Sequence, residues 1–500
     1  MEGDWGDEVP TLLSSSSFCY NNGGPSVLNS PTLLHNFPTS FLPLVHPDKP
    51  LYLNSHKNPI FIPNTRLHFR DLEKQRETRQ WISDIVTSTP NLTFTLHRPF
   101  GYRQIFTANA ANVQHILKSH FHNYHKGEVF RRTLRDFLGD GIFNADGENW
   151  KFQRQVSSHQ FNTKSLRNFV EHVVGVELSD RLVPILKNAA ENNNILDFQD
   201  VLQRVFDNAL KRISERFNSN IPFVWKIKRA LCIGTERDLK ITVQQVREFA
   251  SEIIREKKQE YSLNEPNTNN DLLSRFLSSG HKDEVFVTDI VISFILAGRD
   301  TTSAALTWFF WLVSKNPGVE NEIIKEIRGN NNSEGGPIYD EVKNMVYTHA
   351  SLCESMRLYP PVPVSTKSAV NDDVLPDGTV VKKGTRISYH PYAMGRVEKV
   401  WGADWAEFRP ERWLEWEKTA GKWSFVGRDS FTYPVFQAGP RICLGKEMAF
   451  LQMKRVVAGV LRRFRVVPAV EGMEPVIDAP TPPSLSLSIV APTQKINPPQ

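Results

Sequence analysis

The spacing of hydrophobic and polar positions predicts a mainly helical chain between residues 72 and 463. In most of this region apolar side chains recur every three or four residues, which is typical of amphipathic helices. Shorter runs of β-branched and aromatic residues predict strands between them. The expected helices are 72–88, 110–119, 146–158, 164–190, 196–217, 237–262, 270–278, 286–315, 317–328, 338–346, 347–358 and 445–463, and the expected strands are 92–97, 103–108, 364–370, 379–381 and 385–389.

The fold class that this pattern predicts is mainly α with a small β portion, and no linker divides it. Asn-rich breaks at 264–270 and 329–333 are typical of surface loops. Residues 1–70 are rich in Ser, Asn, Pro and Leu without a sustained period, so we expect an irregular segment there. Residues 468–500 form a Pro-rich tail, which leaves 71–467 as the folded domain.

Composition and charge exclude several classes of protein. Hydrophobic residues make up 40% of the chain, which is enough for a core and excludes a wholly disordered protein. The net charge is only +5 and no dense basic block with interleaved aromatics occurs, so we expect no nucleic-acid partner. Four cysteines are too few for a disulfide scaffold in a chain of this length, and none form a CxxC pair, so we expect reduced thiols: Cys19, Cys232, Cys353 and Cys443.

The residues give no sign of membrane insertion. No apolar run reaches the ~18 residues that cross a bilayer. The sequence starts with the acidic residues Glu2 and Asp4 and lacks the basic and apolar regions of a signal peptide. From the residues alone we therefore expect a soluble chain.

The strongest chemical signal is the loop Phe436-Gln-Ala-Gly-Pro-Arg-Ile-Cys-Leu-Gly445, directly before an expected helix. An isolated cysteine is usually a buried structural thiol. Here Gly439 and Gly445 let the backbone curl so that amide N–H groups point at the sulfur of Cys443. Those groups, the helix N-terminus and Arg441 favour a thiolate. A thiolate held in this way suits the axial coordination of haem iron.

A second signal interrupts the longest apolar helix at Ala297-Gly-Arg-Asp-Thr-Thr302. Glycine in mid-helix costs about 1 kcal/mol relative to alanine, and Gly298 would let a ligand approach the backbone. Thr301 can donate to a backbone carbonyl and open the helix locally. Asp300 and Thr301 together offer an acid and a hydroxyl for proton delivery. Taken alone, the motif is as typical of a satisfied polar break in a core helix.

Two further pairs of residues share helix faces. Glu354 and Arg357 are three residues apart, and Arg412, in Pro-Glu-Arg-Trp413, would complete a charged cluster if all three were buried together. Trp150 and Arg154 are four residues apart and can both donate to a carboxylate. Each pair alone is more typical of an ordinary helix surface. It indicates a function only in combination with the other motifs.

In chain order the motifs are WxxxR, AGxDTT, ExxR, PERW and FxxGxRxCxG. With this order and spacing the sequence resembles the cytochrome P450 family of haem-thiolate monooxygenases, over roughly residues 72–467. The resemblance implies the P450 fold. The stretches 137–154, 297–312, 401–416 and 423–464 resemble plant family 94, which includes fatty-acid ω-hydroxylases and hydroxylases of jasmonoyl-isoleucine.

The resemblance implies a role for each motif residue. Cys443 would be the proximal ligand of haem b, with Phe436 packed near the ligand loop and Gly445 within it. Thr301 and Asp300 would serve dioxygen activation and proton delivery. The other implied roles are distal haem contacts by Ala297 and Gly298, propionate binding by Trp150, Arg154, Arg441 and Lys367, a proximal structural cluster of Glu354, Arg357 and Arg412, and substrate contacts by Val362, Pro363 and Val364.

The same resemblance implies partners and a location. NADPH would supply electrons through a separate NADPH–cytochrome P450 reductase, and the substrate would be a lipophilic small molecule. Lys446, Lys454 and Arg455 would either meet an acidic reductase surface or form a solvated helix face. The implied location is the cytosolic face of the endoplasmic reticulum membrane, although residues 1–70 do not resemble the family's apolar anchor and Pro-rich hinge.

Two further departures from the family concern the substrate pocket. Between Val205–Asn208 and Ser214–Phe217 we expect about one helix of the pocket roof to be missing, so that the domain is shortened around 205–217. After Val467 the family continues into a β hairpin that touches substrate. Here Ala479–Pro483 is rich in proline, which opposes central strand pairing, so we expect a second piece of the pocket to be missing.

The expected function is hydroxylation, by dioxygen, of a fatty-acid-like or acyl-amino-acid substrate near a chain end. Two alternatives stay open. A P450 remnant without turnover is favoured by the missing pocket segments. A haem-thiolate isomerase of hydroperoxides needs no protons delivered to dioxygen, so the pair Asp300 and Thr301 argues against it.

Overall fold

A computed structural model describes residues 51–55, 58–62, 73–97, 103–192, 195–197, 216, 224–263, 272–279, 283–329, 338–419, 421–468 and 486–490. All of them belong to the unit Pro50–Gln500, and Met1–Lys49 is a separate unit. The expected helix 196–217, the shortening around 205–217 and the loop 264–270 lie almost entirely outside the described residues.

Helices dominate the described residues, and most begin and end within a few residues of the predicted bounds. The α-helices are α1 Glu73–Ser88, α2 Ala110–Gln114, α3 Glu128–Leu138, α4 Gly147–Ser158, α5 Thr163–Asn168, α6 Val183–Glu191, α8 Val224–Ala230, α9 Thr235–Leu263, α10 Leu272–Ser278, α11 Glu284–Lys315, α12 Pro317–Gly329, α13 Ile338–Lys343, α14 Val346–Leu358, α15 Pro391–Met394, α16 Glu398–Trp401 and α17 Lys446–Leu461. The segments η2 His115–Ser119, η4 Phe169–Val174 and η5 Glu177–Leu182 have π-helical hydrogen bonding, so the expected helix 164–190 is a succession of α and π turns.

Helices α3 and α8 are not among the expected elements. In α3 the buried residues Thr133, Leu134, Phe137 and Leu138 have the three- and four-residue spacing of an amphipathic helix. Charged side chains fill most of its remaining positions. A segment this polar resembles a surface loop in the sequence, and only the packed structure reveals its apolar face.

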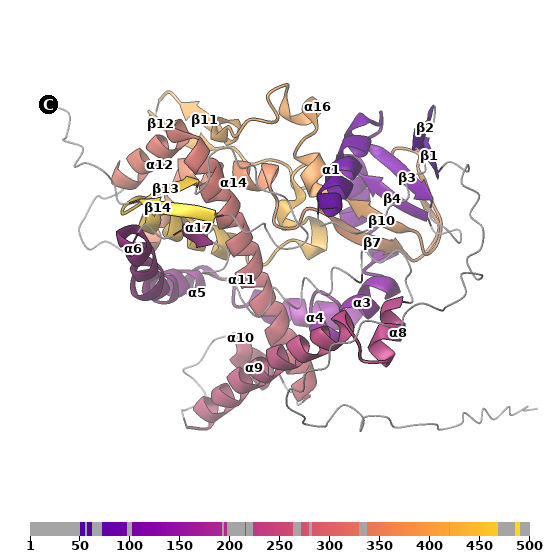
Figure 1. Ribbon diagram of the computed structural model, residues 1–500, viewed down its shortest axis with the longest axis horizontal. Coiled ribbons are helices and arrows are strands. Elements are labelled where there is room, and N and C mark those ends of the chain that lie inside the picture. Colours follow the sequence, from indigo (N-terminus) through magenta and orange to yellow (C-terminus); the bar gives the residue numbers. More distant parts are fainter. Residues whose placement is uncertain are drawn as a thin grey trace, which may run out of the picture. The chain divides into compact units, whose positions relative to one another are not determined.

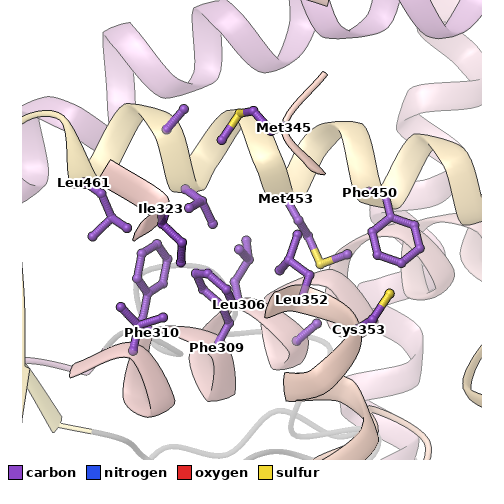
Figure 2. Packing of buried hydrophobic residues seen from close by; sticks show 14 of the residues in the cluster. Leu306, Phe309, Phe310, Ile323, Met345, Leu352, Cys353, Phe450, Met453 and Leu461 are labelled. Carbon is purple, nitrogen blue, oxygen red and sulfur yellow. The ribbon is translucent and has the colours of Figure 1, made fainter. Parts of the chain in front are cut away.

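The main hydrophobic core forms where α11, α14 and α17 meet. Asp283 caps α11 by accepting the N–H of Val285, and the helix is then buried without a break from Thr302 to Val313. In Figure 1 the N-terminal half of α11 lies beside α9 and its C-terminal half beside α14. Figure 2 shows apolar side chains from these three helices packed together: Phe309 and Phe310 of α11, Leu352 of α14, and Phe450 and Met453 of α17.

A seven-stranded sheet has the order β2-β1-β3-β4-β10-β7-β5. Its strands are β1 Leu51–Ser55, β2 Asn58–Ile62, β3 Thr93–His97, β4 Arg103–Thr107, β5 Tyr124–His125, β7 Ser365–Ala369 and β10 Arg386–Tyr389. Strands β4 and β10 are parallel, and the other neighbours are antiparallel. The expectation that all of 1–70 is irregular is therefore wrong for β1 and β2, which extend this sheet.

The chain after Val467 also contains a strand. The order β13-β14-β6 joins Arg465–Pro468, Ser486–Val490 and Ile195–Asp197, and β14 pairs antiparallel with both neighbours. The expectation of an unpaired Pro-rich tail is wrong at this point, because the prolines of 479–483 precede the strand and do not lie within it.

Two small hairpins complete the β structure of the described residues: β8 Asp373–Val374 with β9 Val380–Val381, and β11 Leu414–Glu417 with β12 Lys422–Phe425. None of the helices in the described ranges is long and apolar enough to cross a membrane.

Candidate functional site

The loop that carries Cys443 lies between the single turn Gly439–Arg441 and the start of α17. The N–H of Cys443 donates to the carbonyl of Phe436 over 2.8 Å and closes the loop. Gly439 has a φ of +64°, and a Cβ there would stand 2.0 Å from the carbonyl oxygen of Leu117 in η2. Because glycine alone accepts both the left-handed backbone and this close approach, the path of the loop depends on it.

The thiol of Cys443 lies among groups that act in opposite directions. Its pKa is raised, because the surrounding protein partly desolvates the sulfur, and a hydrogen bond from the Gly445 backbone and the charges of Arg154 and Lys446 offset this only in part. The side chain itself is exposed, as an axial ligand must be to reach a bound group. The amide N–H pointing at the sulfur is the feature that the glycine-punctuated loop led us to expect.

The middle of α11 is accessible although the helix is buried on both sides of it. Gly298 and Thr301 are exposed, whereas most residues of 287–293 and 302–313 are buried. No atom lies within 4 Å of the position of a Cβ on Gly298, so a ligand has room beside the backbone. The Thr301 hydroxyl donates to the carbonyl of Ala297 over 2.6 Å. The helix nevertheless continues unbroken from Glu284 to Lys315, so the expected local opening is absent.

Three cationic side chains, Lys126, Lys367 and Arg441, lie near the carboxylate of Asp146, and Arg154 lies near Arg441 and Cys443. We call these four cations, with Asp146, the cationic cluster. An Nη of Arg441 lies 2.6 Å from Oδ1 of Asp146. The backbone N–H of Lys126 donates to the other oxygen of Asp146 over 3.0 Å. Asp146 also begins α4 as its N-cap residue, so one carboxylate joins the segment before α3, the helix α4 and the Cys443 loop.

Positive charge in the cationic cluster exceeds negative charge. Burial and then the charge of Arg441 lower the pKa of Lys126 to about 8. Burial, followed by the charges of Lys126 and Arg441, holds the pKa of Lys367 well below its ordinary value. Within the described residues, Nε of Arg441 is buried without a hydrogen-bond partner. An anionic group bound here would offset this repulsion and supply the acceptor that is lacking.

Trp150 borders the cationic cluster. The guanidinium of Arg441 lies 4.5 Å from the centre of the Trp150 ring, and the ring of Phe121 packs on Trp150 at 5.6 Å. Trp150 and Arg154 thus reach the same place from one face of α4. Lys126 is the member of the cationic cluster that no motif indicated. Its position depends on β5 pairing with β7, a contact between distant parts of the chain.

Glu354, Arg357 and Arg412 meet in a buried charged cluster. The oxygens of Glu354 accept from Arg357 over 2.8 and 2.7 Å and from Nε of Arg412 over 3.1 Å. Trp413 Nε1 donates to the same carboxylate over 2.9 Å, and Asp404 lies 2.8 Å from Arg412. Glu354 and Arg357 are fully buried, and these added partners, which the motifs did not indicate, satisfy their charges.

The apolar residues named by the resemblance lie at the start of the segment that carries Lys367. Val362 is exposed, and Pro363 and Val364 are half-buried just before β7. The carbonyl of Pro363 accepts the N–H of Tyr392 over 3.2 Å, which fixes this segment against α15. Phe436 packs on Phe450 with ring centres 5.2 Å apart.

The basic residues expected near a partner surface differ in accessibility. Lys454 is only 5% exposed, and its Nζ donates to the carbonyl of Lys343 over 3.1 Å. Both alternatives, contact with an acidic partner and a solvated helix face, are therefore wrong for Lys454, because its charge lies inside the packing of α17 and α13. Lys446 and Arg455 are half-buried.

These residues fit the haem group that the resemblance implies. The exposed sulfur of Cys443 offers an axial ligand, and the space beside Gly298 allows a flat group to approach α11. The cationic cluster, with its partnerless Arg441 Nε, suits the two carboxylates at the edge of the group.

Comparisons with known proteins agree with this geometry. The family described as Cytochrome P450 matches residues 93–219 and 204–497. Cytochrome P450 94A2 of Vicia sativa is 62% identical over 429 residues, which cover 79% of this chain and 83% of that protein. Cytochrome P450 94A1 of Vicia sativa is 59% identical over 418 residues, covering 78% and 81%. Cytochrome P450 94B1 of Arabidopsis thaliana is 46% identical over 420 residues, covering 78% and 82%.

Proposed function

Because this chain belongs to the cytochrome P450 family of monooxygenases, we propose that it hydroxylates a fatty-acid-like or acyl-amino-acid substrate near the end of its acyl chain. The substrate class is the one implied by the resemblance to plant family 94. The observation that carries the proposal is the combination of an exposed cysteine whose sulfur accepts an amide N–H with a cluster in which the cations outnumber the single carboxylate, Asp146.

Haem b is the cofactor that these residues would hold. When bound, it supplies the dioxygen activation that no amino-acid side chain provides. Cys443 would be its proximal ligand, and the hydrogen bond from Gly445 would moderate the electron donation of the thiolate. Arg154, Lys367 and Arg441 would pair with the propionates beside Trp150, and we add Lys126 to them because it shares the same carboxylate, Asp146.

Thr301 and Asp300 would handle protons on the opposite face of the group. The Thr301 hydroxyl gives its own proton to the carbonyl of Ala297, which leaves its lone pairs free to accept a hydrogen bond from water. A water held there would lie beside Gly298, where the space around a Cβ is open. Asp300, one residue earlier and half-buried, would exchange protons with that water.

The apolar side chains of Val362, Pro363 and Val364 suit an acyl chain, and we propose that they line the substrate pocket. The pairing of β14 with β13 supports a folded C-terminal end, which weakens the case for a remnant without turnover. Electrons would come from NADPH through a separate reductase, with Lys446 and Arg455 as the remaining candidates for contact. The proposed location is the cytosolic face of the endoplasmic reticulum membrane.

The first experiment is the spectrum of the reduced, CO-bound full-length chain. A Soret band at the thiolate-ligated position in the wild type, lost in Cys443→Ser, is the expected result. Incubation with NADPH, a plant P450 reductase and fatty acids of graded length or jasmonoyl-isoleucine should then give products hydroxylated near the chain end, located by mass spectrometry.

Other outcomes would replace the proposal. Haem binding without the thiolate signature, or none, would indicate a remnant. Consumption of a fatty-acid hydroperoxide in the absence of NADPH, without hydroxylation in its presence, would indicate an isomerase.

A further inference from the structure

Three side chains that could hold a metal ion come from the two ends of η2 and from β8, and none of them has a role in the proposed reaction. Nδ1 of His115 and Nδ1 of His120 are 3.0 Å apart, and their ring centres are 3.9 Å apart. Nε2 of His115 lies 2.8 Å from Oδ2 of Asp373. The ligand atoms of His115, His120 and Asp373 all lie within 4.8 Å of one another. We propose that His115 and His120 bind a zinc-like transition-metal ion through their Nδ1 atoms, with Asp373 orienting His115.

The distance between the two nitrogens suits a shared metal ion. Zinc binds histidine nitrogen at about 2.0–2.1 Å in tetrahedral geometry, which places two such nitrogens roughly 3.3 Å apart. An ion shared in this way would also place the ring centres roughly 5 Å apart, whereas they are 3.9 Å apart, so the His120 ring has to swing outward to direct its lone pair at the ion. His120 is exposed and follows the last residue of η2, so it has the freedom to make that movement.

Hydrogen bonds in the structure already orient the ring of His115. A histidine that binds metal usually donates its other ring N–H to a carboxylate, which fixes the tautomer and raises the basicity of the ligand. Asp373 occupies that position at Nε2 of His115. Asp373 is itself held by the hydroxyl of Tyr124 over 2.7 Å and by the backbone N–H of Val374 over 2.8 Å.

Without a metal, the same contact would be a hydrogen bond between two imidazoles. If His115 donates from Nε2 to Asp373, its Nδ1 is a bare acceptor, and His120 must donate from Nδ1. A metal ion replaces that single proton and takes a lone pair from each ring. Soft or borderline ions that prefer imidazole, such as zinc, are the expected class, whereas magnesium and calcium prefer oxygen ligands.

A metal ion at this site would hold η2, the element that packs against the Cys443 loop. Leu117 lies between His115 and His120 in the sequence, and its carbonyl is the atom that Gly439 approaches. A metal bound to both histidines would tie the two ends of η2 together under that contact. We therefore expect the ion to stabilise the folded chain, and its role to be structural.

The test uses the full-length chain carrying Cys443→Ser, so that the loop thiol cannot bind the ion. Zinc affinity is measured by competition with a chelating dye, and zinc X-ray absorption identifies the atoms that bind the ion. His120 is exposed, so His120→Asn leaves the fold intact and should lower the affinity at least about 10-fold. Asp373→Asn should lower it about 10–100-fold, whereas the exposed neighbour His122→Asn should leave it unchanged.

The expected absorption spectrum shows nitrogen or oxygen ligands near 2.0–2.1 Å with imidazole scattering. Zinc should also raise the melting temperature of the parent chain and not that of His120→Asn. Equal affinity in the parent and in His120→Asn, or a spectrum without imidazole scattering, would overturn the proposal and leave an imidazole pair joined by a proton. Neither result depends on haem binding or on substrate turnover.

Discussion

An Nη atom of Arg441 lies 2.6 Å from Oδ1 of Asp146, and Cζ of the same arginine lies over the Trp150 ring, 4.5 Å from its centre. One arginine, two residues before the cysteine, thus joins the ligand loop to the start of α4. The same position makes Arg441 a competitor of Lys126 and Lys367 for a single carboxylate. The cationic cluster is therefore suited to bind an added anion. When no anion is bound, repulsion between its cations destabilises the folded protein.

Lys126→Met should stabilise the haem-free protein and weaken its binding of haem. The folded pKa of Lys126 is about 8 against an ordinary value of 10.5. Between these pH values the unfolded chain binds more protons than the folded chain, so the free energy of unfolding rises with pH across this window. Each such lysine adds up to ~1.4 kcal/mol per pH unit to the slope of the free energy of unfolding against pH. The substitution removes the contribution of Lys126 to that slope.

The measurement for Lys126→Met is urea unfolding of the haem-free protein from pH 7 to pH 10. Lys454, whose pKa burial also lowers to about 8, keeps its contribution in the variant, so the slope should decrease without disappearing. The exposed Lys151→Met is the control. An unchanged slope in Lys126→Met would contradict the electrostatic interpretation.

Gly439→Ala should disrupt the Cys443 loop. The substitution combines a φ of +64° with a Cβ 2.0 Å from the Leu117 carbonyl, and we expect a loss of about 2–5 kcal/mol of stability. Gly378→Ala is the matched control, because its φ is +85° but no atom lies within 4 Å of the added Cβ. The control should lose about 1–2 kcal/mol. Similar losses in both variants, measured by chemical denaturation, would mean that the close approach to Leu117 has no effect.

Glu354→Gln should destabilise the fold by about 3–5 kcal/mol, because it leaves two arginines with a neutral partner inside the core. We expect a low yield of soluble protein and a lower urea midpoint. The exposed pair Glu177 and Arg181 provides the control, since Glu177→Gln should change stability by less than about 1 kcal/mol. Wild-type stability in Glu354→Gln would show that the buried charge is dispensable.

Thr301→Ala should lower the yield of hydroxylated product per NADPH by about 10-fold or more, with the lost electrons appearing as peroxide. Thr301→Ser keeps the hydroxyl and should restore coupling. Thr288→Ala removes an equivalent hydrogen bond, from Thr288 to the carbonyl of Glu284 over 2.7 Å, outside the accessible stretch of α11. Its product yield should equal the wild type. Equal peroxide release from Thr301→Ala and the wild type would remove Thr301 from the proposed proton path.

The sequence predicts local features well because they depend on local chemistry. The bounds of α9, α11 and α17 follow from apolar spacing, and the position of the amide N–H at the Cys443 sulfur follows from glycine spacing in one loop. The contact between Glu354 and Arg412 could also be predicted from the sequence, because the carboxylate of a buried Glu–Arg pair needs a further cation or hydrogen-bond donor.

Features that depend on distant contacts were not predictable in this way. Lys126 joins the cationic cluster because β5 pairs with β7, and nothing near Lys126 in the sequence indicates that pairing. The strand β14 follows a Pro-rich stretch, whose composition points to an irregular tail. Burial of Lys454 likewise depends on α13 packing against α17. This packing encloses the basic side chain, which donates a hydrogen bond to the carbonyl of Lys343.

The pairing of β14 with β6 has a consequence for synthesis. Asp197 lies opposite Ser486, so a strand made in the first half of translation waits for almost the whole chain before its neighbour emerges. Contacts between such distant segments form slowly, because a large loop must close first. Until then β6 presents an open hydrogen-bonding edge, to which another chain can pair. A nascent chain that stops before residue 486 keeps that edge exposed, and we expect such products to aggregate or to be degraded.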